Sequence, residues 1–163
     1  MNDQPTQRIE ANLPIRAEIV QSNQPLFFKA QIEIDAPAEK IFDFIIQPKN
    51  HQLMDGSGTV KGSLRGPERL YLGAKFGMKM RVGIPYFITN QVVEFKENRS
   101  IAWRHLLKNV WRYELQPISS GKTLVIESWD GSQARSKWWV SDSEKWVPKS
   151  MAKTLVKLKQ LVE

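Results

Sequence analysis

Hydrophobic residues recur at two spacings along this chain, and the two spacings separate strands from helices. Residues 27–34 alternate between apolar and polar side chains, which predicts a strand. Residues 35–39 then combine an aspartate, a proline and an early glutamate, as helix starts do, and apolar residues recur at helical intervals up to residue 45. Pro48 ends this helix because the residue before a proline avoids helical backbone angles, and the sequence allows a second short helix over 48–54.

From Gly56 to Asp130 the hydrophobic period is two, and turn residues interrupt it at regular intervals. This pattern predicts an antiparallel meander of about six strands. The strands are expected over 59–64, 74–82, 86–95, 101–105, 111–115 and 125–129.

After a Ser- and Trp-rich linker over 131–147, the spacing becomes helical again. A final helix is expected to start near Pro148, with Val147, Met151, Leu155, Leu158 and Val162 in one apolar stripe. The order of elements predicts an α+β fold in which one curved antiparallel sheet wraps around a long C-terminal helix. A single helix seldom fills a curved sheet, so a concave apolar cavity is expected between the two.

The polar residues 1–24 predict a flexible N-terminal arm that contains one extended piece near Arg16–Val20. Residues 25–163 are expected to form a single domain, since a chain of 163 residues falls in the usual range for one core.

The turn positions predict which side chains share the concave face, because directly opposed residues project to the same side of a sheet. Turns centred on Lys108 and Ser120 give one row of His105, Trp111 and Trp129 and a second row of Trp103, Tyr113 and Glu127. The ligand-binding residues expected from this register, the neighbouring strand and the final helix are Phe76, Met78, Met80, Trp103, His105, Trp111, Tyr113, Glu127, Trp129, Met151 and Leu155. The opposite face, with Arg104, Arg112, Glu114 and Asp130, is expected to be solvated.

Two interpretations of the concave face stay open. The aromatic residues are either plain core, with Tyr113 and Glu127 bonded to each other, or the wall of a ligand site. The second interpretation gains support because an inward-facing carboxylate is costly unless it has a partner.

The composition excludes several kinds of site. The chain has no cysteine and two histidines, which rules out disulfides, a thiolate nucleophile and a cysteine- or histidine-rich metal site. No phosphate-binding glycine loop is present, so we expect no metal and no cofactor. The chain shows no apolar membrane span and no secretory signal, which makes the cytoplasm the expected location.

The net charge of +7 raises the question of an anionic partner. From Gly131 to the C-terminus the chain carries seven basic and three acidic residues, and a solvated helix face explains them most simply. No helix-turn-helix, zinc-finger or RNA-recognition signature accompanies the charge, so no specific nucleic-acid partner is expected.

Residues 32–42 (IEIDAPAEKIF) resemble the first strand and helix entry of the START-like (SRPBCC) superfamily. The segments VVEF, IAWR, WRYELQP and GKT are similar to its polyketide cyclase/dehydrase-like branch, and the resemblance spans about residues 26–162. It implies a helix-grip fold with a hydrophobic cavity between the sheet and the C-terminal helix. Members include lipid carriers, hormone- and allergen-type binders, cyclases and chaperone activators. They share no catalytic motif, so the resemblance assigns no catalytic residue.

The pattern and the resemblance predict binding or carriage of a hydrophobic small molecule, such as a lipid, polyketide or aromatic metabolite. The alternative is a polyketide cyclase/dehydratase-type enzyme in which Glu127, Tyr113 and His105 are the acid/base candidates. The protein is expected to be a monomer or a homodimer.

The insert Gln133–Trp146 before the last helix permits three interpretations: a loop packed on the body, a lid over the cavity mouth, or a peripheral membrane contact through residues 135–146. The residues that raise the question are Arg135, Lys137, Trp138, Trp139, Lys145 and Trp146.

Overall fold

The computed structural model describes residues 14–135 and 137–163, without the side chains of Lys137 and Trp139. Within this part of the chain, eight strands form one antiparallel sheet in the order β1-β2-β8-β7-β6-β5-β4-β3. The strands are β1 Glu18–Val20, β2 Phe27–Ile34, β3 Val60–Arg65, β4 Lys75–Val82, β5 Ile84–Lys96, β6 Ser100–His105, β7 Val110–Ser119 and β8 Lys122–Asp130. The helices are α1 Ala38–Ile45, the 3-10 turn η1 Pro48–Asn50, α2 His51–Met54, α3 Lys137–Val140 and α4 Ser143–Val162.

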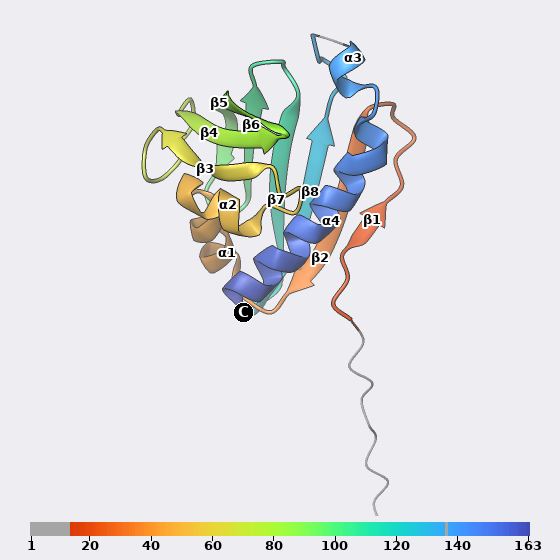
Figure 1. The fold of residues 1–163 in the computed structure, drawn as a ribbon. Coiled ribbons are helices and arrows are strands. Elements are labelled where there is room, and N and C mark those ends of the chain that lie inside the picture. The colour runs from red at the N-terminus through yellow and green to blue at the C-terminus, as the bar shows by residue number, and fades with distance from the viewer. Residues whose placement is uncertain (1–13, 136) are drawn as a thin grey trace, which may run out of the picture.

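The sheet curves around α4, which crosses its concave face, while α1 and α2 cover the same face beside β3 (Figure 1). The predicted apolar stripe of α4 is confirmed, because Val147, Met151, Leu155, Leu158 and Val162 are all buried. They pack with inward side chains of β2 and β8 in one hydrophobic core. The α+β helix-grip arrangement, the meander from β3 to β8 and the short helices after the first long strand are therefore confirmed.

The last helix begins at Ser143, earlier than the start near Pro148 that the sequence predicts. Proline lacks the N–H that would bond to the carbonyl of Glu144, yet the helix continues through it. The reason is burial: Val147 is fully buried, one turn before Met151, so the first turns extend the apolar stripe. The predicted linker 131–147 consequently contains α3 and the start of α4.

The extended piece predicted near Arg16–Val20 forms the edge strand β1, which pairs with β2 through Ile19 and Ala30. Part of the predicted N-terminal arm thus belongs to the sheet. The first 13 residues of that arm lie outside the described residues.

Candidate functional site

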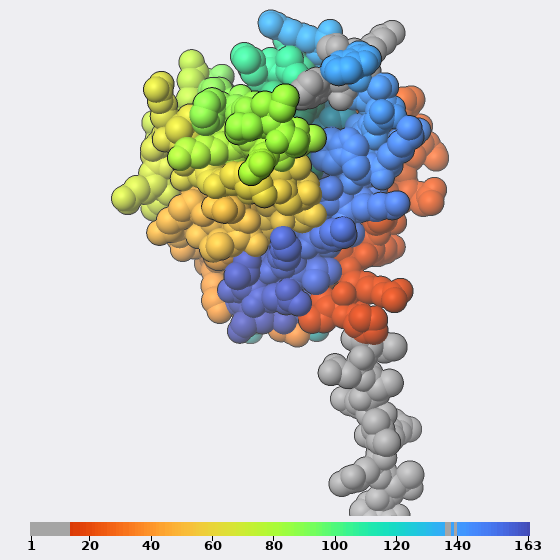
Figure 2. Space-filling view, in the orientation of Figure 1, coloured from red at the N-terminus to blue at the C-terminus, as the bar shows by residue number. Residues whose placement is uncertain are grey.

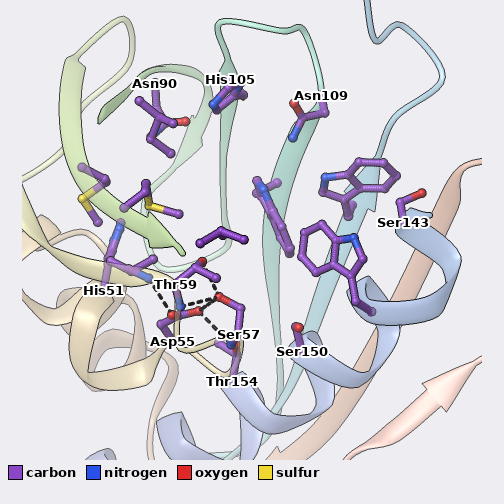
Figure 3. Close-up of a pocket in the computed structure, with 18 of the residues that line it drawn as sticks. His51, Asp55, Ser57, Thr59, Asn90, His105, Asn109, Ser143, Ser150 and Thr154 are labelled. Atoms are coloured by element: carbon purple, nitrogen blue, oxygen red, sulfur yellow. Dashed lines mark hydrogen bonds between the residues drawn. The ribbon is translucent and has the colours of Figure 1, made fainter. Parts of the chain in front are cut away.

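A cavity of about 830 Å³ lies between the concave face of the sheet, α2 and the first half of α4. Figure 3 shows His51 and Asp55 at one end, Asn90, His105 and Asn109 at the other, and Ser143 and Ser150 on α4. Its size is that of sites for drug-sized ligands. The cavity opens between the β4–β5 turn and the α3–α4 segment, where its lining residues Ile84 and Trp138 are 78% and 80% exposed.

Most of the predicted ligand-binding residues line this cavity. Those that do are Phe76, Met78, Met80, Trp103, His105, Trp111, Tyr113, Glu127 and Trp129. Met151 and Leu155, also expected to contact a ligand, are fully buried in the core and are absent from the described lining. They belong to the hydrophobic core, on the helix that contacts β2 and β8.

The register of β7 and β8 is as predicted, with Trp111 opposite Trp129 and Tyr113 opposite Glu127. The register of β6 and β7 is a correction: Trp103, not His105, lies opposite Trp111. The turn is not centred on Lys108. The backbone N–H of His105 instead donates to the carbonyl of Asn109 (2.8 Å), and Lys108 takes a left-handed φ of 71°.

This difference is a shift of two residues, so it leaves every side chain on its predicted face. It does move His105 along the sheet. His105 pairs with Asn90 at the mouth end, about 13 Å along the strands from Tyr113. The three acid/base candidates are therefore not brought together: Tyr113 and Glu127 are in contact, and His105 lies apart from them.

Glu127 is 2% exposed, and its Oε1 accepts a hydrogen bond from the Tyr113 hydroxyl at 2.8 Å. Its Oε2 has no hydrogen-bond partner among the described residues. Burial raises the pKa of Glu127 to about 8, and the charge of Asp55 adds to this effect, while the Tyr113 bond opposes it. Burial and the neighbouring carboxyl also raise the pKa of Tyr113 well above its usual value. The Glu127 carboxyl can therefore hold and exchange a proton near neutral pH, while Tyr113 keeps its own proton.

His51 is a cavity residue that the sequence did not reveal. Its Nε2 donates to the carbonyl of Ile45 at 2.7 Å, and its ring stacks on Trp103 at 5.0 Å between centroids. Burial lowers the pKa of His51 to about 4, so the ring is neutral at physiological pH. No hydrogen bond to Nδ1 occurs among the described residues. A histidine in a four-residue helix gives no sequence signal for this role, because the contact with β6 is entirely tertiary.

The loop after α2 supplies further polar lining that sequence reasoning missed. The Asp55 carboxylate accepts hydrogen bonds from the backbone and hydroxyl of Ser57 and from the backbone of Val60. The hydroxyls of Ser57 and Thr59 are 2.7 Å apart. Asp55, Ser57 and Thr59 all line the cavity (Figure 3). An Asp-Gly-Ser-Gly turn is a common loop signal, so its spacing alone did not identify a site.

At the mouth end, His105 and Asn109 provide two more polar groups. The backbone N–H of Leu107 donates to Nδ1 of His105 at 3.0 Å, so the neutral ring carries its proton on Nε2, which has no hydrogen-bond partner among the described residues. Burial lowers the pKa of His105. Asn109 is buried, and its Oδ1 has no partner among the described residues.

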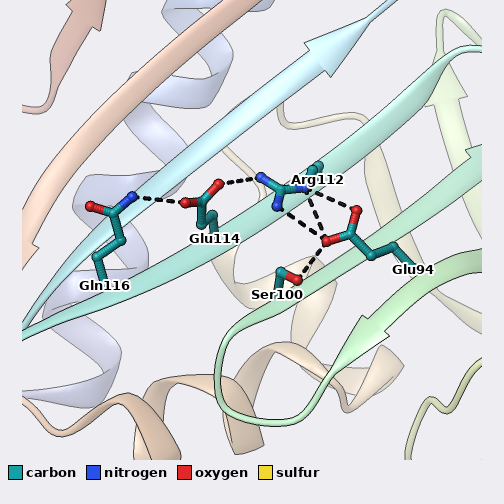
Figure 4. Close-up of polar contacts among 5 residues, drawn as sticks. All are labelled: Glu94, Ser100, Arg112, Glu114 and Gln116. Atoms are coloured by element: carbon teal, nitrogen blue, oxygen red, sulfur yellow. Dashed lines mark hydrogen bonds and ion pairs between the residues drawn. The ribbon is translucent and has the colours of Figure 1, made fainter.

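The outer face of the sheet carries an ion-pair network instead of a cavity (Figure 4). Arg112 donates to both carboxylate oxygens of Glu94 at 3.1–3.2 Å and also bonds to Glu114. Ser100 adds a bond to Glu94, and Gln116 adds one to Glu114. The side chains of Arg112, Glu94 and Glu114 are about one-third exposed, in agreement with the predicted solvated face. Because Glu94, Ser100 and Arg112 come from β5, β6 and β7, the network links these three strands.

The insert Gln133–Trp146 forms α3 and the start of α4 beside the cavity mouth. Trp138 and Trp146 line the cavity and are exposed, and the backbone of Arg135 donates to the carbonyl of Leu107. Figure 2 shows the β4–β5 hairpin in light green and the first turns of α4 in blue on neighbouring parts of the molecular surface. The side chains of Lys137 and Trp139 lie outside the described residues. No cluster that could hold a metal ion occurs in the described part of the chain, and none of its helices is long and apolar enough to cross a membrane.

Comparison with known proteins gives a family match and many similar folds. A family model described as polyketide cyclase/dehydrase and lipid transport matches residues 27–163. The uncharacterized protein Rv0088 of Mycobacterium tuberculosis is 40% identical over 100 residues, which are 61% of this chain and 45% of the relative. The chain thus aligns with less than half the length of that curated relative.

Among solved structures, protein Ms6760 of Mycobacterium smegmatis has a TM-score of 0.69 at 13% identity, covering 90% of this chain and 97% of that one. Protein NE0264 of Nitrosomonas europaea has a TM-score of 0.65 at 15% identity, covering 83% and 93%. The Aha1 dimer of Colwellia psychrerythraea has a TM-score of 0.57 at 15% identity, covering 84% and 96%. At these identities the solved structures share the fold alone.

Proposed function

The chain belongs to the polyketide cyclase/dehydrase and lipid transport family, and from this premise we propose that it binds or carries a hydrophobic small molecule in the cavity between sheet and α4. The observation that carries the proposal is an aromatic cavity of about 830 Å³ that opens to solvent at one end. A core that served packing alone would be filled, since interiors are close-packed. Lipids, polyketides and aromatic metabolites all fit this description.

The test is to measure whether the purified protein retains or takes up a guest. Native mass spectrometry of the protein as isolated is expected to show added mass that organic extraction removes. Ser150 projects from α4 into the cavity (Figure 3), so Ser150→Trp is expected to fill the space and weaken guest binding by more than roughly tenfold. The matched control is Gln160→Trp, an exposed position on the same helix outside the lining. Equal binding by both variants would place the guest elsewhere.

The Tyr113–Glu127 pair favours a second candidate function, catalysis of polyketide cyclisation or dehydration. The ionised fraction of a carboxyl with a pKa near 8 can take a proton from the carbon between two carbonyl groups. The resulting enolate carbon then attacks a second carbonyl carbon of the same chain, and the carboxyl returns the proton to that carbonyl's oxygen. Glu127→Gln keeps the size and one hydrogen-bond acceptor but cannot accept that proton. With a linear poly-β-ketone as substrate, this change is expected to abolish cyclised product while the substrate still binds, as product analysis and a binding titration would record. An unchanged rate would remove Glu127 from the mechanism.

Contact with a membrane surface through residues 135–146, a cytoplasmic location and the choice between monomer and homodimer stay predictions of the sequence. Exposed Trp138 and Trp146 at the mouth, with the exposed cations Arg135 and Lys145 nearby, support the membrane contact. Co-sedimentation with anionic vesicles at low and high salt would test it.

A further inference from the structure

The electrical character of the cavity differs from that of the whole protein. The chain carries a net charge of +7, yet no lysine or arginine occurs among the described residues that line the cavity. Both lining histidines have a lowered pKa and are uncharged near neutral pH. The acidic groups that line it are Asp55, Glu127 and Asp142, and Asp142 is paired with Lys145 at 2.6 Å. In the inner part of the cavity, a guest with a negative charge would therefore meet the carboxyl groups of Asp55 and Glu127 and no lining lysine or arginine.

Glu127 is the group in this cavity that most needs a partner. It is buried, Tyr113 occupies Oε1, and Oε2 has no hydrogen bond among the described residues. The ion pairs of the described residues include none to Glu127. A buried carboxylate without a cation is expensive, so without one Glu127 holds its proton up to a pH of about 8. A bound cation would supply the missing charge.

Aromatic rings surround the same region. The ring centroids of Trp103 and Tyr113 are 5.6 Å apart, and those of Trp111 and Trp129, which meet edge to face, are 6.5 Å apart. All four line the cavity with Glu127. The face of an indole or phenol ring attracts alkylammonium groups through its quadrupole, and the attraction grows when water is excluded. The carboxyl group and the ring faces together can replace the water molecules that a cationic head loses when it enters the cavity.

We propose that the cavity selects organic cations, in which an amine or quaternary ammonium head lies at Glu127 among the rings and an apolar body extends toward the mouth. This inference rests on the proposed function and narrows its ligand class. Asp55 strengthens the selection because its carboxylate, held by Ser57 and Val60, acts electrostatically on Glu127. The methionine wall of Met78 and Met80 gives the apolar body a surface that adapts to its shape.

The test uses three probes with one aromatic body and different charge: (2-naphthylmethyl)trimethylammonium, 2-naphthalenemethanol and 2-naphthaleneacetate. Isothermal titration calorimetry on the full chain is expected to rank them cation, neutral, anion, with the cation about tenfold tighter than the neutral probe. Glu127→Gln is expected to remove that preference while the neutral probe binds as before.

Glu114→Gln is the matched control, because it makes the same chemical change on the outer face of β7, and its probe ranking should equal that of the unchanged protein. Neutral or anionic probes that bind the unchanged protein as tightly as the cation would overturn the charge selection and leave the proposed function standing. Binding of none of the three would overturn the charge selection, and if native mass spectrometry also showed no removable mass, the proposed function would be overturned too. The order of probe affinities on the unchanged protein shows whether the cavity prefers the cation, even if the Glu127→Gln variant folds poorly.

Discussion

Between about pH 4.5 and 6.5 the free energy of unfolding is expected to stay nearly constant, because the pH dependence due to Glu127 cancels that due to His51. The free energy of unfolding should decrease on both sides of this range. Glu127 has a pKa raised from 4.5 to about 8 by burial. The folded state therefore binds this proton more tightly than the unfolded chain. The contribution of Glu127 to stability is complete below pH 4.5 and is lost as the pH rises to about 8, a loss of about 5 kcal/mol.

His51 acts in the opposite direction, because burial lowers its pKa from 6.5 to about 4. The unfolded chain binds this proton more tightly, so the contribution of His51 is complete above pH 6.5 and is lost as the pH falls to about 4, a loss of about 3 kcal/mol. In the shared interval the two slopes have equal size and opposite sign. Glu94 and Glu114, whose pKa values the Arg112 contacts lower, add to the loss on the acid side.

Urea unfolding of the unchanged protein and of Glu127→Gln across about pH 4 to 9 would separate the two groups, as order-of-magnitude effects. The variant should show no loss between pH 6.5 and 8, and below pH 6.5 its stability should fall steadily as His51 takes up its proton. Glu114→Gln again serves as control, since it should leave the alkaline loss in place. Parallel profiles for Glu127→Gln and the unchanged protein would show that Glu127 does not titrate abnormally.

Gly56→Ala is expected to destabilise the fold by about 3 kcal/mol or more and to lower Tm by roughly 10 °C. A Cβ at this position would lie 2.3 Å from the carbonyl oxygen of Ser150 and 2.4 Å from the backbone nitrogen of Thr154. Both atoms belong to the α4 backbone, so no side chain can move aside. The Gly56 N–H donates to the Thr154 hydroxyl at 2.9 Å, and displacement of the loop would break this bond too.

Thermal unfolding followed by circular dichroism measures this effect. Gly121→Ala provides the comparison, because a Cβ there meets nothing within 4 Å and the stability should change by less than about 0.5 kcal/mol. Similar Tm values for the two variants would contradict the close approach of the loop to α4. Because the same loop carries Asp55 and Ser57, the Gly56 variant is also expected to distort the inner end of the cavity.

The period-two pattern was sufficient to predict the meander and the inner face of β7 and β8. The reason is that hydrophobic alternation depends on which face is buried, and a shift of register by two residues leaves the faces unchanged. Trp111, Tyr113, Glu127 and Trp129 were therefore placed correctly on the cavity wall. The register of β6 depends on the turn, and a left-handed Lys108 is uncommon enough that the sequence did not indicate it.

The parts that the sequence did not reveal depend on contacts between distant segments. His51 is buried because α2 packs against Trp103 and Phe76, which come from β6 and β4. Met151 and Leu155 lie in the core and not in the cavity lining, and this depends on the distance between α4 and the sheet. Sequence periodicity gives the buried face of a helix but not its distance from the opposite layer, so it could not separate core residues from cavity lining.

Each of the five tryptophans whose side chains the structure describes lines the cavity: Trp103, Trp111, Trp129, Trp138 and Trp146. Indole emission responds to the polarity of its surroundings, and here these five indoles surround one space. A guest that replaces water there should shift or quench the emission of the unlabelled protein. Intrinsic tryptophan fluorescence therefore reports binding in this cavity without a label, and compound libraries could be screened with it.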